Sequence, residues 1–120
     1  SYLSQFQPGD NCFILEDNTI QPYVKIGNNV VLWSGNHIGH DVVIEDHCFI
    51  TSHVVVSGFV KIERNCFLGV NATIRDGITI APETLIAAGA IIMKDTEEKG
   101  VYLAQRSVKF EKNSDEIKIS

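Results

Sequence analysis

Four histidines lie within one short segment of the chain, residues 36–53 (NHIGHDVVIEDHCFITSH), and the sequence contains no others. An imidazole can ligate a metal ion, or it can accept a proton in a catalytic step near neutral pH. A metal site needs several ligands at one point, whereas a general base needs one imidazole and one group that orients it. The elements that carry the histidines therefore decide which of these chemistries is available.

An aliphatic residue recurs at every sixth position, without a gap, from Ile14 to Ile92. A period of six is three strand periods of two, so each hexapeptide can form one short strand and one turn. The position four residues after each aliphatic is small, β-branched or otherwise uncharged, as in Asn18, Val24 and Val30. Two inward positions in every six predict a narrow three-sided tube, in which three hexapeptides make one coil. With parallel strands about 4.8 Å apart, the coils form a prism roughly 22 Å tall.

This pattern resembles the hexapeptide-repeat proteins, which fold as left-handed parallel β-helices, and the resemblance covers residues 13–95. It implies an all-β fold of about four to five coils, and the left-handedness is an expectation taken from the family. We expect a lead-in over residues 1–12 and a carboxyl-terminal strand and tail over residues 96–120. The strand is predicted around Val101–Leu103, and the polar tail is predicted to be partly disordered or to form a short helix.

Composition narrows the range of functions. Fifteen acidic residues against ten basic ones give a formal net charge of −5, which argues against a nucleic-acid partner. No apolar run approaches the roughly 20 residues of a membrane helix, and no secretory signal opens the chain. We therefore expect a cytoplasmic protein with no membrane partner. The three cysteines, Cys12, Cys48 and Cys66, recur in phase with the coil and are predicted to fill a small inward position as free, buried thiols.

One outward column of the predicted tube is apolar. It comprises Phe13, Val31, Phe49, Phe67 and Leu85, spaced eighteen residues apart. A monomer rarely exposes such a stripe, and tubes of this family are usually trimers with parallel axes. We expect a homotrimer with this column at the subunit interface, to which Trp33 also contributes. The alternative is that the carboxyl-terminal segment folds back over the column.

The histidines occupy different parts of the predicted coil. His53 lies one coil beyond Gly35 and so comes near His37, whereas His47 lies on another part of the triangle. One protomer therefore cannot gather all four. The γ-class carbonic anhydrases, which share the fold, bind zinc through three histidines across a subunit boundary, two of them five residues apart. The separations here are 3, 6, 7, 10, 13 and 16 residues, so we expect no metal, and a zinc enzyme stays as an alternative.

The segment IGHDVVI, residues 38–44, is similar to the histidine–acid step of bacterial sugar O- and N-acetyltransferases of the sialic-acid and UDP-amino-sugar type. The segments GFVKIERNCFLGVNATI and IAAGAIIMKDTEEKGVY match the same group. The resemblance implies that His40 is the general base and that Asp41 orients it. It also implies that Gly58 and Ala88 contact the acyl donor, acetyl-CoA. At Gly58 the missing Cβ leaves room for the pantetheine arm, and the backbone N–H can donate to the thioester oxygen.

Other positions and alternatives are less closely defined. Lys94 and Arg106 are candidates to meet the phosphates of the coenzyme, and His37 is a candidate substrate or interface contact. The glycine–proline–alanine–lysine signature that follows the coil in many relatives is absent.

Such enzymes usually carry an amino-terminal α/β domain, so we expect either the carboxyl-terminal part of a longer protein or a compact member. The predicted reaction is acetyl transfer to an amino or hydroxyl group of a nucleotide-activated small-molecule sugar, and a non-catalytic scaffold remains an alternative.

Overall fold

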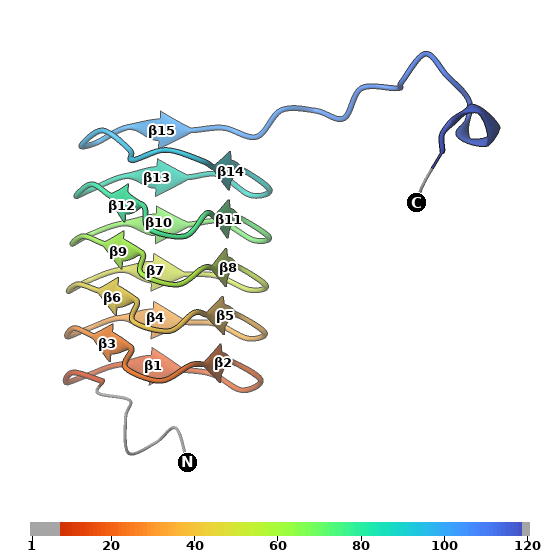
Figure 1. Cartoon of the computed structure of the whole chain (residues 1–120). Coiled ribbons are helices and arrows are strands. Elements are labelled where there is room, and N and C mark those ends of the chain that lie inside the picture. Colours follow the sequence, from red (N-terminus) through yellow and green to blue (C-terminus); the bar gives the residue numbers. More distant parts are fainter. Residues whose placement is uncertain (1–7, 119–120) are drawn as a thin grey trace.

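The structure is a computed structural model that describes residues 8–118, and its main body is a three-sided prism of short stacked strands (Figure 1). Each strand spans two residues. The strands are β1 (Phe13–Ile14), β2 (Thr19–Ile20), β3 (Lys25–Ile26), β4 (Val31–Leu32), β5 (His37–Ile38), β6 (Val43–Ile44), β7 (Phe49–Ile50), β8 (Val55–Val56), β9 (Lys61–Ile62), β10 (Phe67–Leu68), β11 (Thr73–Ile74), β12 (Thr79–Ile80), β13 (Leu85–Ile86), β14 (Ile91–Ile92) and β15 (Val101–Tyr102).

Every third strand pairs in parallel, which gives three sheets. Their orders are β1-β4-β7-β10-β13-β15, β14-β11-β8-β5-β2 and β12-β9-β6-β3. The register advances by eighteen residues per coil, as in Phe13↔Val31 and Thr19↔His37. The all-β, parallel β-helix that the hexapeptide period predicted is confirmed, with about five turns, and it is consistent with the left-handed winding that the family resemblance implied. Only the last pairing departs from the register, because Leu85 lies opposite Val101, sixteen residues on.

The interior is the stack of aliphatic side chains that the sequence predicted. From Ile20 to Ile92 every residue of the six-residue series is buried, and Ile14 is half-buried at the open lower end. Cys48 and Cys66 are buried and Cys12 is half-buried, so the prediction of inward thiols is confirmed. The thiol of Cys48 donates to the carbonyl oxygen of Glu63, 3.1 Å away in the next coil. The neighbouring Cys66 thiol and burial together raise the pKa of Cys48.

The corners of the prism carry a second period of six. One residue in each corner has a left-handed backbone, with φ between 56° and 75°, and these residues follow one another every six positions from Asn11 to Gly89. A left-handed backbone costs most side chains about 1–2 kcal/mol, while Gly tolerates it and Asn, Asp and His are enriched there. His47 and His53 are two of these corner residues (φ 61° and 59°). Their spacing therefore follows from the fold and needs no ligand to explain it.

The three outer faces differ in chemistry. The sheet β12-β9-β6-β3 is called the charged face here, because it presents Lys25, Glu45, Lys61 and Glu63. On it, Lys61 lies 3.6 Å from a carboxylate oxygen of each of Glu45 and Glu63. The sheet that begins with β1 instead presents apolar side chains, and we call it the apolar face; it comprises Phe13, Leu15, Val31, Trp33, Phe49, Phe67, Leu85, Val101 and Leu103. Trp33 packs edge-on against Phe49 at 5.3 Å between ring centroids, and Phe49 stacks on Phe67 at 5.5 Å.

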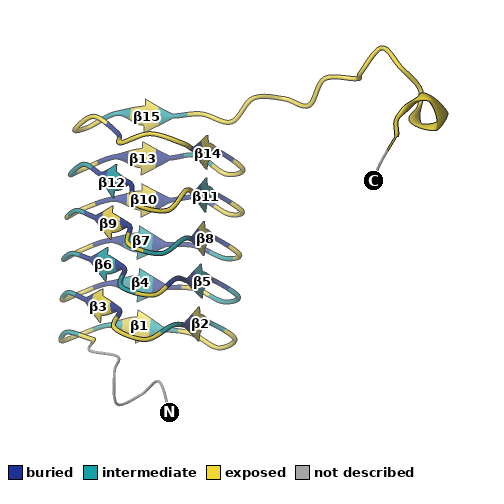
Figure 2. Ribbon diagram, viewed as in Figure 1, coloured by how far each residue is buried: buried dark blue, intermediate teal, exposed yellow. Residues whose placement is uncertain are grey.

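The carboxyl-terminal segment leaves the prism after β15 (Figure 1). Residues 103–118 are exposed throughout (Figure 2), and they end in a short 3-10 helix, Ser114–Glu116. Phe67 and Leu85 remain about two-fifths exposed, so the alternative in which this segment folds over the apolar column is wrong for the single chain. Seven residues of the lead-in predicted for residues 1–12 lie outside the described residues. Within residues 8–118, no helix has the length and apolar character to cross a membrane.

Candidate active site

His40 and Asp41 form an imidazole–carboxylate pair at the corner that follows β5. The Nδ1 atom of His40 lies 3.1 Å from Oδ2 of Asp41, and both side chains are partly open to solvent. Asp41 is the left-handed residue of this corner, with φ at 59°. Since Asp is one of the few residues that tolerate this backbone, the turn accommodates the carboxylate at low cost.

The backbone of this corner is held by the coils on either side. The N–H of His40 donates to Oε1 of Gln21 (2.9 Å), and the N–H of Asp41 donates to the carbonyl oxygen of Pro22 (3.2 Å). The carbonyl oxygen of His40 accepts from the N–H of Phe59 in the next coil (3.0 Å). These hydrogen bonds hold the main chain of His40 in place, so the imidazole projects from a well-ordered turn.

The imidazole of His40 lies against Gly58, which occupies the same corner one coil further on. A methyl group added to Gly58 would come within 2.8 Å of Nε2 and 2.9 Å of Cε1 of His40. Gly58 is partly exposed, and no group among residues 8–118 accepts a hydrogen bond from its N–H. The corner therefore places Nε2 of an imidazole beside a backbone donor, and such a pair of groups can remove a proton and stabilise an oxyanion.

The other predicted positions are distributed over the molecule. Lys94 is exposed at the same corner as His40, three coils further along the prism. Ala88 is exposed at a different corner, the one that follows β13. Arg106 is exposed in the carboxyl-terminal segment. His37 is half-buried on the outer side of β5, between Thr19 and Val55. The single chain thus brings His40, Asp41 and Gly58 together, and Ala88 and Arg106 lie elsewhere on it.

The remaining histidines do not join this corner. The ring of His53 lies against Gly35, where an added methyl group would come within 2.6 Å of Nδ1. His47 is exposed at the third corner of the triangle. Within residues 8–118, no three His, Cys, Asp or Glu side chains gather as a metal-binding group.

Sequence reasoning missed an aromatic neighbour of the candidate base. The ring of Phe59 packs edge-on against the imidazole of His40, with 4.9 Å between ring centroids and an interplanar angle of 89°. Phe59 is a corner residue with φ at 60°, and its side chain is 64 % exposed. The available signal was an aromatic residue at a turn position that Asn, Asp, His or Gly occupies in most other hexapeptides.

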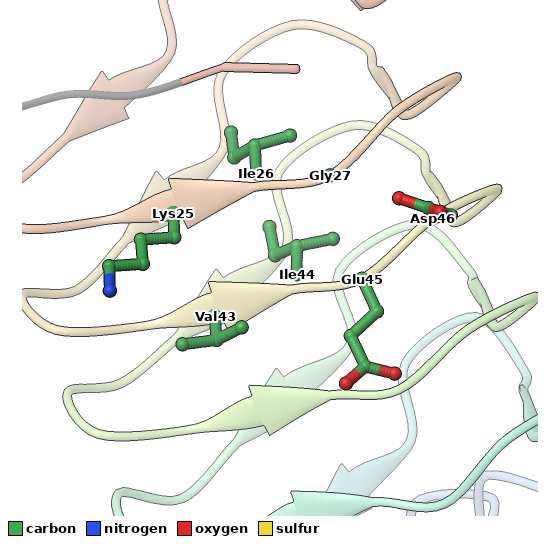
Figure 3. A pocket seen from close by; sticks show the side chains of 7 residues that line it. All are labelled: Lys25, Ile26, Gly27, Val43, Ile44, Glu45 and Asp46. Carbon is green, nitrogen blue, oxygen red and sulfur yellow. The ribbon is translucent and has the colours of Figure 1, made fainter. Parts of the chain in front are cut away.

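A shallow hollow of about 320 Å³ lies elsewhere, on the charged face between β3 and β6. Figure 3 shows Ile26 and Ile44 behind it and the side chains of Lys25 and Glu45 in front. It contains neither His40 nor Gly58. The hollow is therefore separate from the β5 corner, where the imidazole of His40 is about half exposed.

Two family descriptions match the coil. "Bacterial transferase hexapeptide (six repeats)" matches residues 23–58, and "Hexapeptide repeat of succinyl-transferase" matches residues 59–94. The two segments are contiguous, and together they span the corners that carry His40, Asp41, Gly58 and Lys94.

Two curated relatives are similar in sequence. UDP-3-O-acylglucosamine N-acyltransferase of Delftia acidovorans (strain DSM 14801 / SPH-1) is 27% identical over 108 residues, which cover 87% of this chain and 30% of the relative. Probable UDP-3-O-acylglucosamine N-acyltransferase 2, mitochondrial, of Arabidopsis thaliana is 31% identical over 89 residues, which cover 74% of this chain and 26% of the relative. The chain thus spans less than a third of the length of the curated relatives it matches.

Solved structures resemble the coil in shape. A histidine-to-asparagine variant of perosamine N-acetyltransferase from Caulobacter crescentus, in complex with CoA and GDP-perosamine, aligns with a TM-score of 0.80 at 21% identity and covers 82% of this chain and 47% of that one. WeeI from Acinetobacter baumannii AYE aligns with a TM-score of 0.70 at 18% identity, over 82% and 51% of the two chains. At these identities the likeness establishes the fold.

Proposed function

Because the chain belongs to the hexapeptide-repeat family of bacterial transferases, we propose that it carries the catalytic coil of an acyltransferase that moves an acetyl group from acetyl-CoA to a nucleotide-activated sugar. The observation that carries the proposal is the corner in which His40 Nδ1 lies 3.1 Å from Asp41 Oδ2 and the imidazole packs against Gly58. In this proposal residues 13–95 form the catalytic coil and residues 96–120 its extension.

His40 is the general base and Asp41 orients it. When the carboxylate of Asp41 accepts from Nδ1–H, the lone pair of the imidazole is on Nε2, the atom that faces the Gly58 side of the corner. Nε2 removes a proton from the acceptor amine or hydroxyl as that group attacks the thioester carbonyl. The carboxylate then stabilises the imidazolium that has formed.

Gly58 serves the donor carbonyl. As the acceptor's N–C or O–C bond forms, the carbonyl oxygen takes up negative charge, and the unpaired N–H of Gly58 can donate to it. When the carbon–sulfur bond breaks, the proton on His40 passes to the departing CoA thiolate. Direct attack is favoured over an acyl-enzyme because Cys48 and Cys66 are buried inside the prism.

The donor is proposed to lie in a groove between two prisms. Ala88 and Arg106 lie away from the His40 corner of their own protomer, so in this arrangement they reach the coenzyme from a neighbouring protomer, while Lys94 shares the corner of His40. The phosphates would meet the side chains of Lys94 and Arg106. The solved perosamine N-acetyltransferase, which has the same fold, binds CoA, and this supports an acyl-CoA donor here.

A homotrimer would supply that groove. The apolar face exposes Phe67, Leu85 and Val101 by 40 %, 42 % and 62 % of their surfaces, and burial of such a face is the usual reason for association. The donor and the nucleotide sugar are metabolites of the cytoplasm, which is the location that we propose.

The acceptor group is an amine or a hydroxyl, and the amine is the first to test. Both curated relatives are N-acyltransferases of a UDP-linked glucosamine, and the solved relative acts on the amino sugar perosamine. His37, half-buried on β5 in the same coil, is a candidate contact for the acceptor or for the neighbouring protomer.

The test combines binding and turnover. Calorimetry with acetyl-CoA is expected to give saturable binding, and release of free CoA thiol is expected to depend on an amino-sugar nucleotide, with UDP-glucosamine and GDP-perosamine as the first acceptors. Absence of acyl-CoA binding would favour a non-catalytic scaffold. Stoichiometric zinc in protein purified without added metal would favour the zinc enzyme instead.

A further inference from the structure

The corner column that contains Asp41 differs from the other two corners of the prism. Its left-handed positions are occupied, coil by coil, by Tyr23, Asp41, Phe59 and Gly77. In the other two columns these positions hold Asn, Asp, His or Gly, with Glu83 as the one exception before the final turn. The two aromatic residues of the series therefore fall at one corner, directly below and directly above the carboxylate that pairs with His40.

Neither aromatic residue is explained by packing. Tyr23 is 60 % exposed and Phe59 is 64 % exposed, so the core gains little from them. A bulky side chain at positive φ also costs about 1–3 kcal/mol, a cost usually seen at functional positions. Asn would relieve the backbone cost and still complete the turn, as it does at Asn29, Asn65 and Asn71.

The geometry ties Phe59 to the reacting corner. Its N–H donates to the carbonyl oxygen of His40 (3.0 Å), and its ring packs edge-on against the imidazole with 4.9 Å between ring centroids. One edge of the imidazole is thereby covered, while the outer surface of the Phe59 ring stays open to solvent. A ligand whose reacting group approaches His40 from the Phe59 side lies within contact distance of that surface.

The aromatic ring of Phe59 favours a particular kind of ligand group beside it. The face of an aromatic ring carries partial negative charge, and it attracts the weakly positive C–H edge of a neighbouring group. A pyranose presents such C–H bonds on its apolar face, and its amine or hydroxyl groups project from the rim toward a base. We propose that Phe59, with Tyr23 as a second wall two coils below, is an acceptor-positioning residue that holds the sugar ring beside His40. This inference rests on the proposed function and adds to it the part of the substrate that the corner recognises.

The test is ligand binding by the full chain, measured by NMR for two matched pairs, UDP-glucosamine with UDP and GDP-perosamine with GDP. The variant is Phe59→Asn, and the control is Glu83→Asn, the same replacement at a left-handed position of another corner. For at least one pair, the wild type is expected to bind the sugar nucleotide more tightly than the nucleotide alone. Phe59→Asn is expected to weaken that binding about three- to tenfold and to leave nucleotide binding unchanged.

Saturation transfer separates sugar contact from a change of fold. Irradiation of the aromatic protons is expected to reach the pyranose protons equally in the wild type and in Glu83→Asn, and to reach them more weakly in Phe59→Asn, where only Tyr23 remains. The melting temperature of Phe59→Asn should equal or exceed that of the wild type. Equal sugar binding in all three proteins, equal weakening in both variants, or no gain from the sugar in the wild type would each overturn the proposal. Acetyl transfer is assayed separately. If the sugar binds in a Phe59-dependent way but no acetyl group is transferred, the proposed reaction is rejected and the sugar site is retained.

Discussion

Nδ1 of His40 lies 3.1 Å from Oδ2 of Asp41, the next residue in the chain. Adjacent residues seldom point their side chains at one another in a strand, where successive side chains alternate between faces. Here the left-handed backbone of Asp41 (φ 59°) breaks that alternation at the corner. The turn that closes each side of the prism therefore also builds the imidazole–carboxylate pair.

Asp41→Asn tests the carboxylate without disturbing the turn. Asn is equally tolerant of a left-handed backbone, so the melting temperature should stay within a few degrees of the wild type. The neutral amide of Asn cannot stabilise an imidazolium as a carboxylate does. Its NH2 group can also donate to Nδ1 and so favour the wrong tautomer of His40, and kcat should therefore fall roughly tenfold or more. Steady-state kinetics with acetyl-CoA would measure this. An unchanged kcat in a folded variant would mean that Asp41 serves only the corner.

Gly58→Ala tests the space between the two coils. The added methyl group would come within 2.8 Å of Nε2 of His40, so the imidazole must move. A displacement of about 1 Å typically costs 10²-fold in rate, and a loss of that size in kcat is expected. Asp76→Ala, at the same corner one coil further on, is the control, because that position already carries a Cβ. Similar rates for both variants would remove Gly58 from the site.

Phe67→Glu tests association through the apolar face. Phe67 is 40 % exposed in the single chain, so the protomer should tolerate the change, whereas three buried carboxylates would not fit an interface. Light scattering is expected to report a trimer for the wild type and smaller species for the variant. Lys25→Glu, on the charged face, should leave the trimer intact. A monomeric wild type would contradict the assignment of this face.

The thiols report on the packing of the prism. Because Cys48 and Cys66 are buried and the pKa of Cys48 is raised by the adjacent Cys66 thiol and by burial, both should react slowly with a thiol reagent. Raising the pH from 7 to 9 should accelerate labelling in denaturant much more than in folded protein. The half-buried Cys12, at the open end, is expected to react first. Rapid labelling of Cys48 in folded protein would mean that the coils open readily.

The fold was predictable because one physical constraint repeats. A three-sided interior admits one aliphatic side chain per strand, and the unbroken series from Ile14 to Ile92 records that constraint. The corner period was equally visible in the Asn, Asp, His and Gly residues at six-residue spacing, but it acquired meaning only once φ was known. It explains why His47 and His53 stand at corners, which the coil period alone could locate only relative to His37 and the triangle.

The candidate site was only partly predictable. His40, Asp41 and Gly58 were predicted on the strength of a family resemblance, and the coil period alone puts His40 and Gly58 at one corner. The contact between Phe59 and His40 depends on side-chain orientation, which a repeat pattern does not encode. The path of residues 103–118 could not be predicted either. The final coil shortens from eighteen residues to sixteen between Leu85 and Val101, and no repeat continues after it.

The most direct test of the account is the rate of acetyl transfer by His40→Ala, measured beside acetyl-CoA binding and oligomeric state. The imidazole is half exposed, so its removal should leave the fold, the assembly and donor binding intact. General base catalysis is typically worth 10²–10⁴-fold, so kcat should fall by roughly that factor. Wild-type kcat in a correctly assembled His40→Ala protein would contradict the central claim that this corner performs the chemistry.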